Sequence, residues 1–178
     1  MKIIATNTLS LSEINGLKYL FDKEYLEDFG PWTLADPYGY SSLENHVLVL
    51  DRECIVGYAG SQKRLISVGN ENVVIAGIGG VLVDKNYRGV GIASKIMEVL
   101  INYNKTSLGA DFSYLGCRDE VLPFYLSCGF QQLKRLETRI NSEGQLVTEV
   151  CSNILVADGL KKVDEFPQGE IKLNGRAW

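Results

Sequence analysis

The chain has 178 residues, of which 46% are apolar, and its 18 basic and 22 acidic side chains give a net charge of −4. This length and apolar content predict one folded domain, residues 1–178, and exclude a disordered chain. The acidic balance argues against a nucleic-acid-binding protein. The single histidine, His46, excludes a three-histidine metal site.

The cysteines and the lengths of the apolar runs favour the cytoplasm. No Cys-x-x-Cys pair occurs, so we expect no zinc site, and we expect four free, buried thiols, those of Cys54, Cys117, Cys128 and Cys151. No apolar run reaches about 18 residues, and the N-terminal apolar stretch is too short for a secretory signal. The sequence therefore predicts a soluble cytoplasmic protein without a membrane segment or a metal.

The first part of the chain predicts a strand, a helix and a long loop. A strand at 2–6 precedes a capping-box pattern, Ser10 followed by Glu13, and apolar residues at helical spacing then predict a helix at 11–26. Residues 26–40 are acidic and aromatic and include two prolines and two glycines. We expect a loop that binds a ligand or moves, because long irregular loops are otherwise uncommon.

Three β-rich runs follow, at 46–50, 54–68 and 73–83, with turn sequences between them, and they predict an antiparallel meander. The third run contains Gly77, Gly79 and Gly80. Glycines inside a strand indicate a bulge or a close approach of a ligand or another backbone segment.

The second half predicts a helix from about 92 to near 109, a strand at 112–116, a short helix at about 119–127, and a hairpin of strands 130–140 and 146–156. The element order is β-α-βββ-α-β-α-ββ. We therefore expect an α/β (α+β) fold in which a mixed, largely antiparallel twisted sheet is flanked by helices.

The segment Arg88-Gly89-Val90-Gly91-Ile92-Ala93 lies between the glycine-bearing strand and a helix. Its glycines leave backbone N–H groups uncovered at the positive end of the helix dipole, which is an arrangement that binds anions. The Walker sequence and the Gly-x-Gly-x-x-Gly fingerprint are both missing from this turn. The segment therefore predicts a phosphate or pyrophosphate site of another type.

This segment resembles the Arg/Gln-x-x-Gly-x-Gly/Ala signature of the GNAT superfamily of acetyl-CoA-dependent N-acetyltransferases, matched by Arg88, Gly91 and Ala93. The segment 123–130, with Tyr125 and a final Gly-Phe, is similar to the aromatic segment of that family, and the predicted element order is also that of the family. The resemblance covers nearly the whole chain and implies a GNAT-like fold with acetyl-CoA as cosubstrate.

The resemblance implies direct attack of an amine on the thioester, without an enzyme nucleophile. It assigns the cofactor-binding residues, namely Val81, Leu82 and Val83 along the pantetheine arm and the backbone amides of Arg88, Gly89, Val90, Gly91, Ile92 and Ala93 at the pyrophosphate. Tyr125 is the expected general acid, because a phenol can protonate a thiolate of similar basicity. Cys117 could suggest a ping-pong scheme, which the resemblance and the lack of a second histidine argue against.

The general base and the acceptor site stay open. The candidate bases are Asp28, Asp36, Glu44, His46 and the α-carboxylate of Trp178, although His46 more often has a structural role in such a strand. The residues expected to bind the acceptor are Asp28, Trp32, Asp36, Tyr38, Gly79 and Trp178, with Tyr40 as a further wall. The aromatic residues could contact a cation or could anchor the loop.

A narrower likeness is to the aminoglycoside 2'-N-acetyltransferases, which would link the protein to antibiotic resistance. It rests on Asp28-Phe29, the spacing from Val81 to Ala93, the segment ending Gly129-Phe130, and the final Trp178. That group has a glutamate where Gly79 stands and an aspartate where Arg176 stands. Both differences remove negative charge that an aminoglycoside would use.

The leading hypothesis is acetyl transfer from acetyl-CoA to a small cationic amine, with an aminoglycoside as one candidate. The alternatives are a non-catalytic acyl-CoA-binding or sensing domain, which the glycine at position 79 suggests, and a protein or peptide N-acetyltransferase. A homodimer is a further open alternative, and we expect neither a nucleic-acid nor a membrane partner. Residues 13–36 carry a local charge of −4, which could attract an amine cation.

Overall fold

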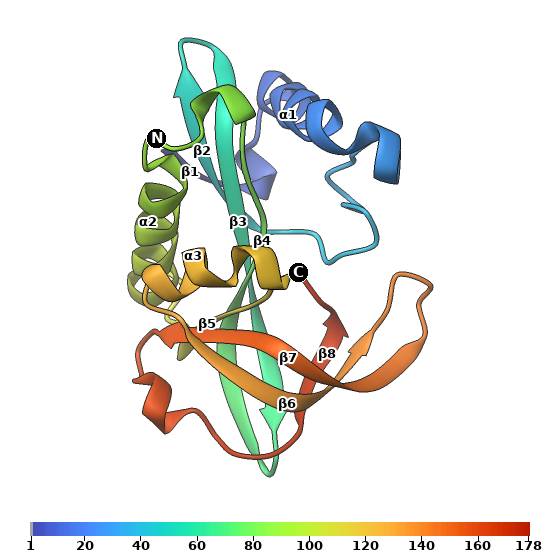
Figure 1. Ribbon diagram of the computed structural model, residues 1–178, viewed down its shortest axis with the longest axis vertical. Coiled ribbons are helices and arrows are strands. Elements are labelled where there is room, and N and C mark those ends of the chain that lie inside the picture. Colours follow the sequence, from blue (N-terminus) through green and yellow to red (C-terminus); the bar gives the residue numbers. More distant parts are fainter. Residues whose placement is uncertain (1) are drawn as a thin grey trace.

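The structure, a computed structural model, describes residues 2–178, so Met1 of the predicted domain lies outside the described residues. Within these residues, eight strands form one sheet with three α-helices around it (Figure 1). The strands are β1 (Lys2–Ala5), β2 (Asn45–Asp51), β3 (Cys54–Val68), β4 (Glu71–Val83), β5 (Phe112–Gly116), β6 (Gln131–Ile140), β7 (Leu146–Asp158) and β8 (Ile171–Arg176). The helices are α1 (Leu11–Phe29), α2 (Ile92–Thr106) and α3 (Leu122–Ser127), and the 3-10 turns are η1 (Thr6–Thr8), η2 (Lys85–Tyr87), η3 (Asp119–Val121) and η4 (Val163–Glu165).

The predicted element order is confirmed up to the end of β7, and the predicted mixed α/β fold with it. The capping box that starts α1 is present, because the Ser10 hydroxyl accepts a hydrogen bond from the Glu13 amide and the Glu13 carboxylate accepts one from the Ser10 amide. The prediction ended this helix too early. It continues to Phe29 and stops at Gly30, whose φ of 77° a non-glycine residue rarely adopts.

The two faces of the sheet are covered by different helices. Tyr58 and Tyr114 belong to the core cluster that contains the buried residues of α1, whereas their neighbours Ala59 and Leu115 belong to the cluster around α2 and α3. Successive residues of a strand point to opposite faces. The sheet is therefore sandwiched between α1 on one face and α2 with α3 on the other (Figure 1).

Strand β8 was not predicted, and it closes part of the sheet into a ring. The sheet order is β1-β2-β3-β4-β5-β7-β6-β8, and β8 also pairs with β3 through Ser67–Lys172 and Val68–Ile171. β4 and β5 run parallel, as do β6 and β8, while the other paired strands are antiparallel. Strands β3, β4, β5, β7, β6 and β8 thus form a closed ring.

The glycines of β4 mark a bulge, as predicted. Gly60 pairs with Gly79 and Tyr58 pairs with Leu82, so two residues of β4 oppose one residue of β3. Gly80 has a φ of 64°, and a Cβ atom there would lie 2.7 Å from the Tyr58 ring. Only glycine fits this position, and the bulge bends the end of β4.

Candidate functional site

A groove opens where β4 and β5 separate. The two strands pair only from Ile75–Phe112 to Gly77–Tyr114, although β4 continues to Val83. The groove has a volume of about 1110 Å³, and at the β4 and α2 end it is lined by Val81, Leu82, Val83, Arg88, Ala93, Cys117, Phe124 and Tyr125. Five residues predicted to bind the cofactor, Val81, Leu82, Val83, Arg88 and Ala93, therefore line one groove.

Helix α2 presents its N-terminus to this groove. Gly89 and Gly91 have φ values of 81° and 82°, and α2 has no side-chain N-cap. The helical hydrogen bonds begin with the Lys95 amide, which donates to the Gly91 carbonyl at 3.1 Å, so the amides of residues 92–94 have no intrahelical acceptor. Free amides and the helix dipole together form an anion site of the predicted kind. Gly89, Val90, Gly91 and Ile92 lie in this turn without lining the cavity themselves.

The Arg88 side chain holds this turn in place. Its Nε donates to the Val83 carbonyl at 2.9 Å, and its Nη2 donates to Glu24 at 2.8 Å. The side chain thereby connects the end of β4 to α1, and the pKa of Glu24 falls mainly through this hydrogen bond. The guanidinium is committed to these partners, which leaves the backbone amides as the anion donors.

Tyr125 lies in α3, beside the groove, and is 9% exposed. It packs edge-on against Phe124 and Phe130, with ring centroids 5.0 and 6.0 Å away. Burial, followed by the nearby Cys117 and Cys128, raises the pKa of Tyr125 above its usual value. The phenol therefore keeps its proton over the neutral range and can donate it.

The four cysteines are free, as predicted, but none of them is buried, so that part of the prediction is wrong. Cys54 is exposed, and Cys117, Cys128 and Cys151 are half-buried. Cys117 lines the groove, and burial and then Asp119 raise the pKa of its thiol. A thiol held in its neutral form is a poor nucleophile, which agrees with direct transfer.

A second, smaller cavity of about 300 Å³ joins the groove at Tyr25, Tyr40, Val81, Arg118 and Trp178, which line both. Its aromatic lining comes from α1, the 30–44 loop, β3 and the segment after β8, and consists of Phe21, Tyr25, Phe29, Trp32, Tyr38, Tyr40, Tyr58 and Trp178. We call this cavity the aromatic pocket. Of the residues predicted to bind the acceptor, it contains Trp32, Tyr38, Gly79 and Trp178.

Trp178 packs on two glycines of β4, with its ring over Gly77 and its main chain against Gly79. A Cβ atom at Gly77 would lie 2.2 Å from this ring, and one at Gly79 would lie 3.1 Å from the main-chain carbonyl carbon of Trp178. The indole Nε1 donates to Gln62 at 3.0 Å, and the Arg64 guanidinium stacks 3.9 Å from the ring centroid. These glycines therefore make room for Trp178. A catalytic role for its carboxylate stays a prediction.

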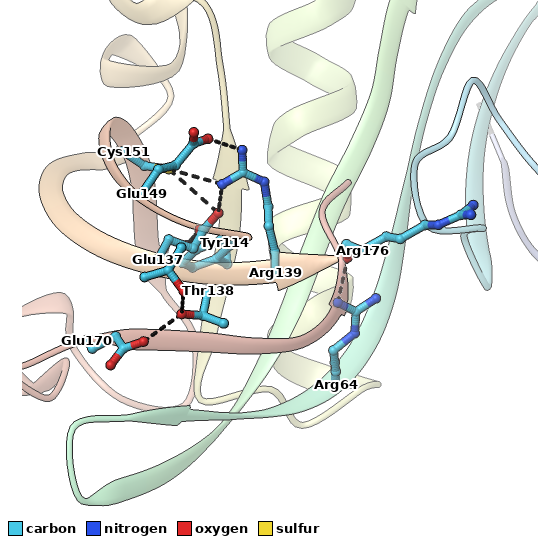
Figure 2. A network of polar contacts seen from close by, with 10 residues as sticks. Arg64, Tyr114, Glu137, Thr138, Arg139, Glu149, Cys151, Glu170 and Arg176 are labelled. Atoms are coloured by element: carbon cyan, nitrogen blue, oxygen red, sulfur yellow. Dashed lines mark hydrogen bonds and ion pairs between the residues drawn. The ribbon is translucent and has the colours of Figure 1, made fainter. Parts of the chain in front are cut away.

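Arg64 also joins β3 to β8 and to the loop. Its Nη1 donates to the carbonyls of Leu173 and Arg176, and its Nη2 donates to the Ser41 hydroxyl. Figure 2 shows Arg64 reaching the Arg176 backbone, and the Ser41 amide donates to the Ala177 carbonyl at 2.8 Å. The 30–44 loop is thus fastened to the segment that carries Trp178.

Tyr38 has two unusual features. Its φ is 57°, in the region that residues other than glycine rarely adopt, and its hydroxyl is buried without a hydrogen-bond partner among residues 2–178. Burial, followed by Asp22 and Tyr25, raises the pKa of Tyr38 to about 12. Because an unpaired buried hydroxyl is costly, this atom is a candidate ligand-binding group.

His46 is fully buried and lines neither cavity. The Thr6 hydroxyl donates to the Leu43 carbonyl, so it accepts from Nε2 of His46 at 2.7 Å, and Nδ1 accepts from the Tyr58 hydroxyl at 2.9 Å. Burial lowers the pKa of His46 to about 4. The imidazole is therefore neutral and fully hydrogen-bonded, as a structural histidine is.

The other predicted bases lie away from both cavities. Asp28 is exposed on α1, Asp36 is exposed and pairs with Arg176 at 3.1 Å, and Glu44 is exposed beside Gln62. The structure does not bring these carboxylates together with Trp32, Tyr38 and Gly79. Their catalytic and binding roles stay predictions, without support from their positions.

Sequence reasoning missed a polar network at the other end of the groove. The Tyr114 hydroxyl donates to Glu137, and Arg139 pairs with both Glu137 and Glu149, while the Cys151 sulfur lies 3.3 Å from Arg139 (Figure 2). Glu137 is 5% exposed. Nothing in the local sequence distinguishes these side chains from the solvated face of a hairpin, because it is the pairing of β5 with β7 that brings Tyr114 to them.

The aromatic stripe on α1 was also missed, although the sequence does contain a signal for it. Phe21, Tyr25 and Phe29 follow one another at four-residue intervals and therefore lie on one helix face. They are in ring contact, with centroids 6.5 Å apart for the first pair and 6.0 Å for the second. The spacing could have placed one wall of the aromatic pocket.

Two findings limit the kinds of site present in the described part of the chain. Across residues 2–178, no cluster of three or more histidine, cysteine or acidic side chains is placed to hold a metal ion. No helix in the same range has the length and apolar character needed to cross a membrane.

The parted strands and the helix N-terminus between them form a groove suited to an anionic ligand, and the comparisons identify the family. Residues 10–133 match the family model described as an acetyltransferase (GNAT) domain. The chain belongs to this GNAT acetyltransferase family. Membership implies an acyl-CoA-dependent N-acetyltransferase in general.

Solved structures show the same fold. One is the crystal structure of ElaA from Escherichia coli, with a TM-score of 0.60 and 20% identity over 88% of this chain and 98% of that chain. Another is an acyl-CoA N-acyltransferase from Pseudomonas aeruginosa, with a TM-score of 0.58 and 17% identity over 88% and 97% of the two chains. A third is the GNAT family protein YhbS from Escherichia coli in complex with CoA, with a TM-score of 0.58 and 16% identity over 97% and 88%. No curated protein matches the chain significantly.

Proposed function

We propose that the protein transfers the acetyl group of acetyl-CoA to the amine of a small acceptor by direct attack. The observation that carries this proposal is the junction of the two cavities. The groove that contains the α2 N-terminus meets the aromatic pocket at Val81, Arg118 and Trp178. A thioester held in the groove would reach the mouth of a pocket large enough for a small ligand.

The chain's own residues would divide the work as follows. The amides of residues 92–94 would bind the pyrophosphate, and the backbone of Val81 and Val83 would position the pantetheine arm. The neutral amine nitrogen forms a bond to the carbonyl carbon, the carbon–sulfur bond breaks, and Tyr125 protonates the departing thiolate. The new amide nitrogen loses one proton, which returns through water to the Tyr125 phenolate. A small acceptor is favoured over a protein chain, because the 30–44 loop is fastened to the segment after β8 and covers one side of the pocket.

Binding of acetyl-CoA is tested with a pair of glycine variants. Gly91 and Gly144 both have a positive φ, 82° and 81°, and at both positions a Cβ atom would meet nothing within 4 Å. Alanine costs each site a similar amount of backbone strain, about 1–2 kcal/mol, but only Gly91→Ala disturbs the amides of the anion site. Isothermal calorimetry should show at least ten-fold weaker acetyl-CoA binding for Gly91→Ala and unchanged binding for Gly144→Ala.

Transfer is tested by the release of free CoA thiol from acetyl-CoA over a panel of small amines and peptides. Amine-dependent thiol release with formation of the N-acetyl product supports the proposal. Absence of acetyl-CoA binding would overturn it. Tight binding without turnover on any amine would instead identify an acyl-CoA-binding domain.

A further inference from the structure

We propose that the acceptor is a primary amine carrying an aromatic ring, which binds in the aromatic pocket, and not a polycation; this inference rests on the proposed transferase function. The evidence is the lining of the pocket, the state of the nearby carboxylates, and the unpartnered Tyr38 hydroxyl.

The walls of the pocket suit a flat apolar group. Phe21 and Trp32 are stacked with centroids 5.1 Å apart and an interplanar angle of 6°, and Phe29 and Tyr38 close another side at 5.4 Å. The volume, about 300 Å³, is at the small end of the range for ligand pockets, roughly 300–1,000 Å³. Aromatic rings favour stacked or edge-on contact with another ring, and such contacts give specificity.

The pocket offers no acidic side chain to a polycation. Arg118, at the junction with the groove, is the one described lining residue with a charged side chain. The acidic residues that line the groove are already engaged, since Glu24 pairs with Arg88, Glu137 and Glu149 pair with Arg139, and Asp119 accepts from Asn153. An aminoglycoside would have to leave several ammonium groups without partners, which is costly.

The apolar walls also favour the reactive form of the amine. Burial disfavours an ammonium ion, so it lowers the pKa of a bound amine. The neutral amine is the nucleophile, and its proton is lost to water as it enters. This accounts for a pocket that no predicted side-chain base lines.

Tyr38 lines the pocket, and its hydroxyl lies within the pocket wall, covered by neighbouring atoms. It is unpaired among residues 2–178, and its raised pKa keeps it protonated, so it can both donate and accept a hydrogen bond. We assign it to a polar atom of the bound amine, which would reach it when the covering side chains move aside. Satisfying this hydroxyl would remove the cost of leaving it unpaired in the empty pocket.

The test measures binding separately from turnover. The probes are 2-phenylethylamine, ethylamine as the ring-free control, and kanamycin and spermidine as polycations. Saturation-transfer NMR and tryptophan fluorescence follow binding, and thiol release follows transfer. We expect 2-phenylethylamine to bind and react at least ten-fold better, as kcat/KM, than ethylamine or either polycation.

Two aromatic residues of α1 provide a matched pair of variants. Phe29 is 63% exposed and lines only the aromatic pocket, whereas Tyr19 is 70% exposed and lines neither cavity. Both are exposed enough for alanine to leave the fold intact. Phe29→Ala should weaken 2-phenylethylamine binding roughly three- to ten-fold, while Tyr19→Ala leaves it unchanged. Tyr38→Phe should also weaken binding, and its thermal stability without ligand should not fall.

The outcomes separate this inference from the proposed function. Transfer to kanamycin or spermidine without binding of 2-phenylethylamine would overturn the inference and leave the transferase function standing. Binding of 2-phenylethylamine that depends on Phe29, without transfer to any amine, would support the pocket assignment and overturn the transferase function. Equal binding of phenylethylamine and ethylamine would also overturn the inference.

Discussion

At the scale of single residues, His46 links folding to pH. Its Nε2–H and its Nδ1 lone pair are both used, by Thr6 and Tyr58, so the imidazole is held neutral with a pKa of about 4. In the unfolded chain its pKa returns to about 6.5. Between these two values the unfolded chain binds a proton that the folded chain does not, so the stabilisation is complete above pH 6.5 and is lost as the pH falls toward 4.

We therefore expect the free energy of unfolding to drop by about 2 kcal/mol between pH 7.5 and pH 5. Urea unfolding followed by fluorescence at a series of pH values measures this. His46→Gln cannot titrate, so its stability should be lower at pH 7.5 but nearly flat over the same range. A wild-type protein as flat as the variant would contradict the assigned environment of His46.

Tyr125 is the residue whose loss should affect chemistry more than binding. Because burial raises its pKa, the phenol stays protonated at neutral pH and is available to the departing thiolate. Tyr125→Phe keeps the ring that packs on Phe124 and Phe130 and removes the proton donor. We expect kcat to fall about 10²-fold or more, with little change in acetyl-CoA affinity, in steady-state assays with calorimetry.

The exposed Tyr19 provides the control for that measurement, since Tyr19→Phe should change neither kcat nor affinity. An unchanged kcat for Tyr125→Phe would remove Tyr125 from the acid role. In the wild-type protein and in Tyr19→Phe alike, kcat should not fall as the pH rises to about 10, because the raised pKa of Tyr125 keeps the phenol protonated up to that pH.

At the scale of elements, β4 combines a structural and a functional requirement. Its bulge at Gly80 directs the strand end into the groove, while Gly77 and Gly79 leave space for Trp178. Strand glycines usually weaken a sheet. Here they allow another segment to approach the backbone more closely than any side chain would permit.

Gly77→Ala should therefore displace Trp178. Its new Cβ atom would lie 2.2 Å from the indole, whereas a Cβ atom at Gly116, in the neighbouring β5, would meet nothing within 4 Å. We expect Gly77→Ala to cost about 1–3 kcal/mol and to shift the tryptophan fluorescence toward that of an exposed indole. Gly116→Ala should do neither, and a silent Gly77→Ala would contradict the packing described for Trp178.

The elements also show what the sequence could predict. Strands β2 to β7 and helices α1 and α2 carry clear apolar periodicity, and the glycines of the turn at 88–93 predict an anion site. Strand β8 could not be read, because it has only two buried apolar residues, Ile171 and Leu173. It is a strand because β3 and β6 offer it hydrogen bonds from distant parts of the chain.

The candidate site was predictable to a different degree in its two halves. The predicted cofactor half comes from one continuous segment, residues 81–93, and five of its members line one groove, while their role in cofactor binding stays a prediction. The acceptor half is assembled from α1, the 30–44 loop, β4 and Trp178, and only tertiary structure shows that Asp28 and Asp36 face away from it. The sequence predicts that the helix ends at residue 26, so Phe29 does not count there as a helical neighbour of Tyr25.

At the scale of the whole molecule, the acidic side chains of residues 13–36 and the aromatic pocket lie in different places. The acidic excess over residues 13–36 lies largely on the surface of α1 and the loop, where Glu24 pairs with Arg88, Asp22 with Lys18 and Asp36 with Arg176. Exposed ion pairs of this kind contribute little stability. Glu24–Arg88 joins the turn at 88–93 to α1 and Asp36–Arg176 joins the loop to β8, while the pocket between them stays apolar.

The pairing of β3 with β8 closes the ring of strands, and we call this pairing the seam. Arg64 on β3 and Leu173 on β8 are 109 residues apart in sequence, and contacts of such separation are among the slowest to form. The seam carries Trp178 and the anchor of the loop, so the pocket exists only while the seam is closed. An occupant of the pocket would in turn favour the closed state by mass action. Amide hydrogen exchange in β8 should therefore slow when the pocket is filled, which makes the strand that closes the ring a reporter of acceptor occupancy.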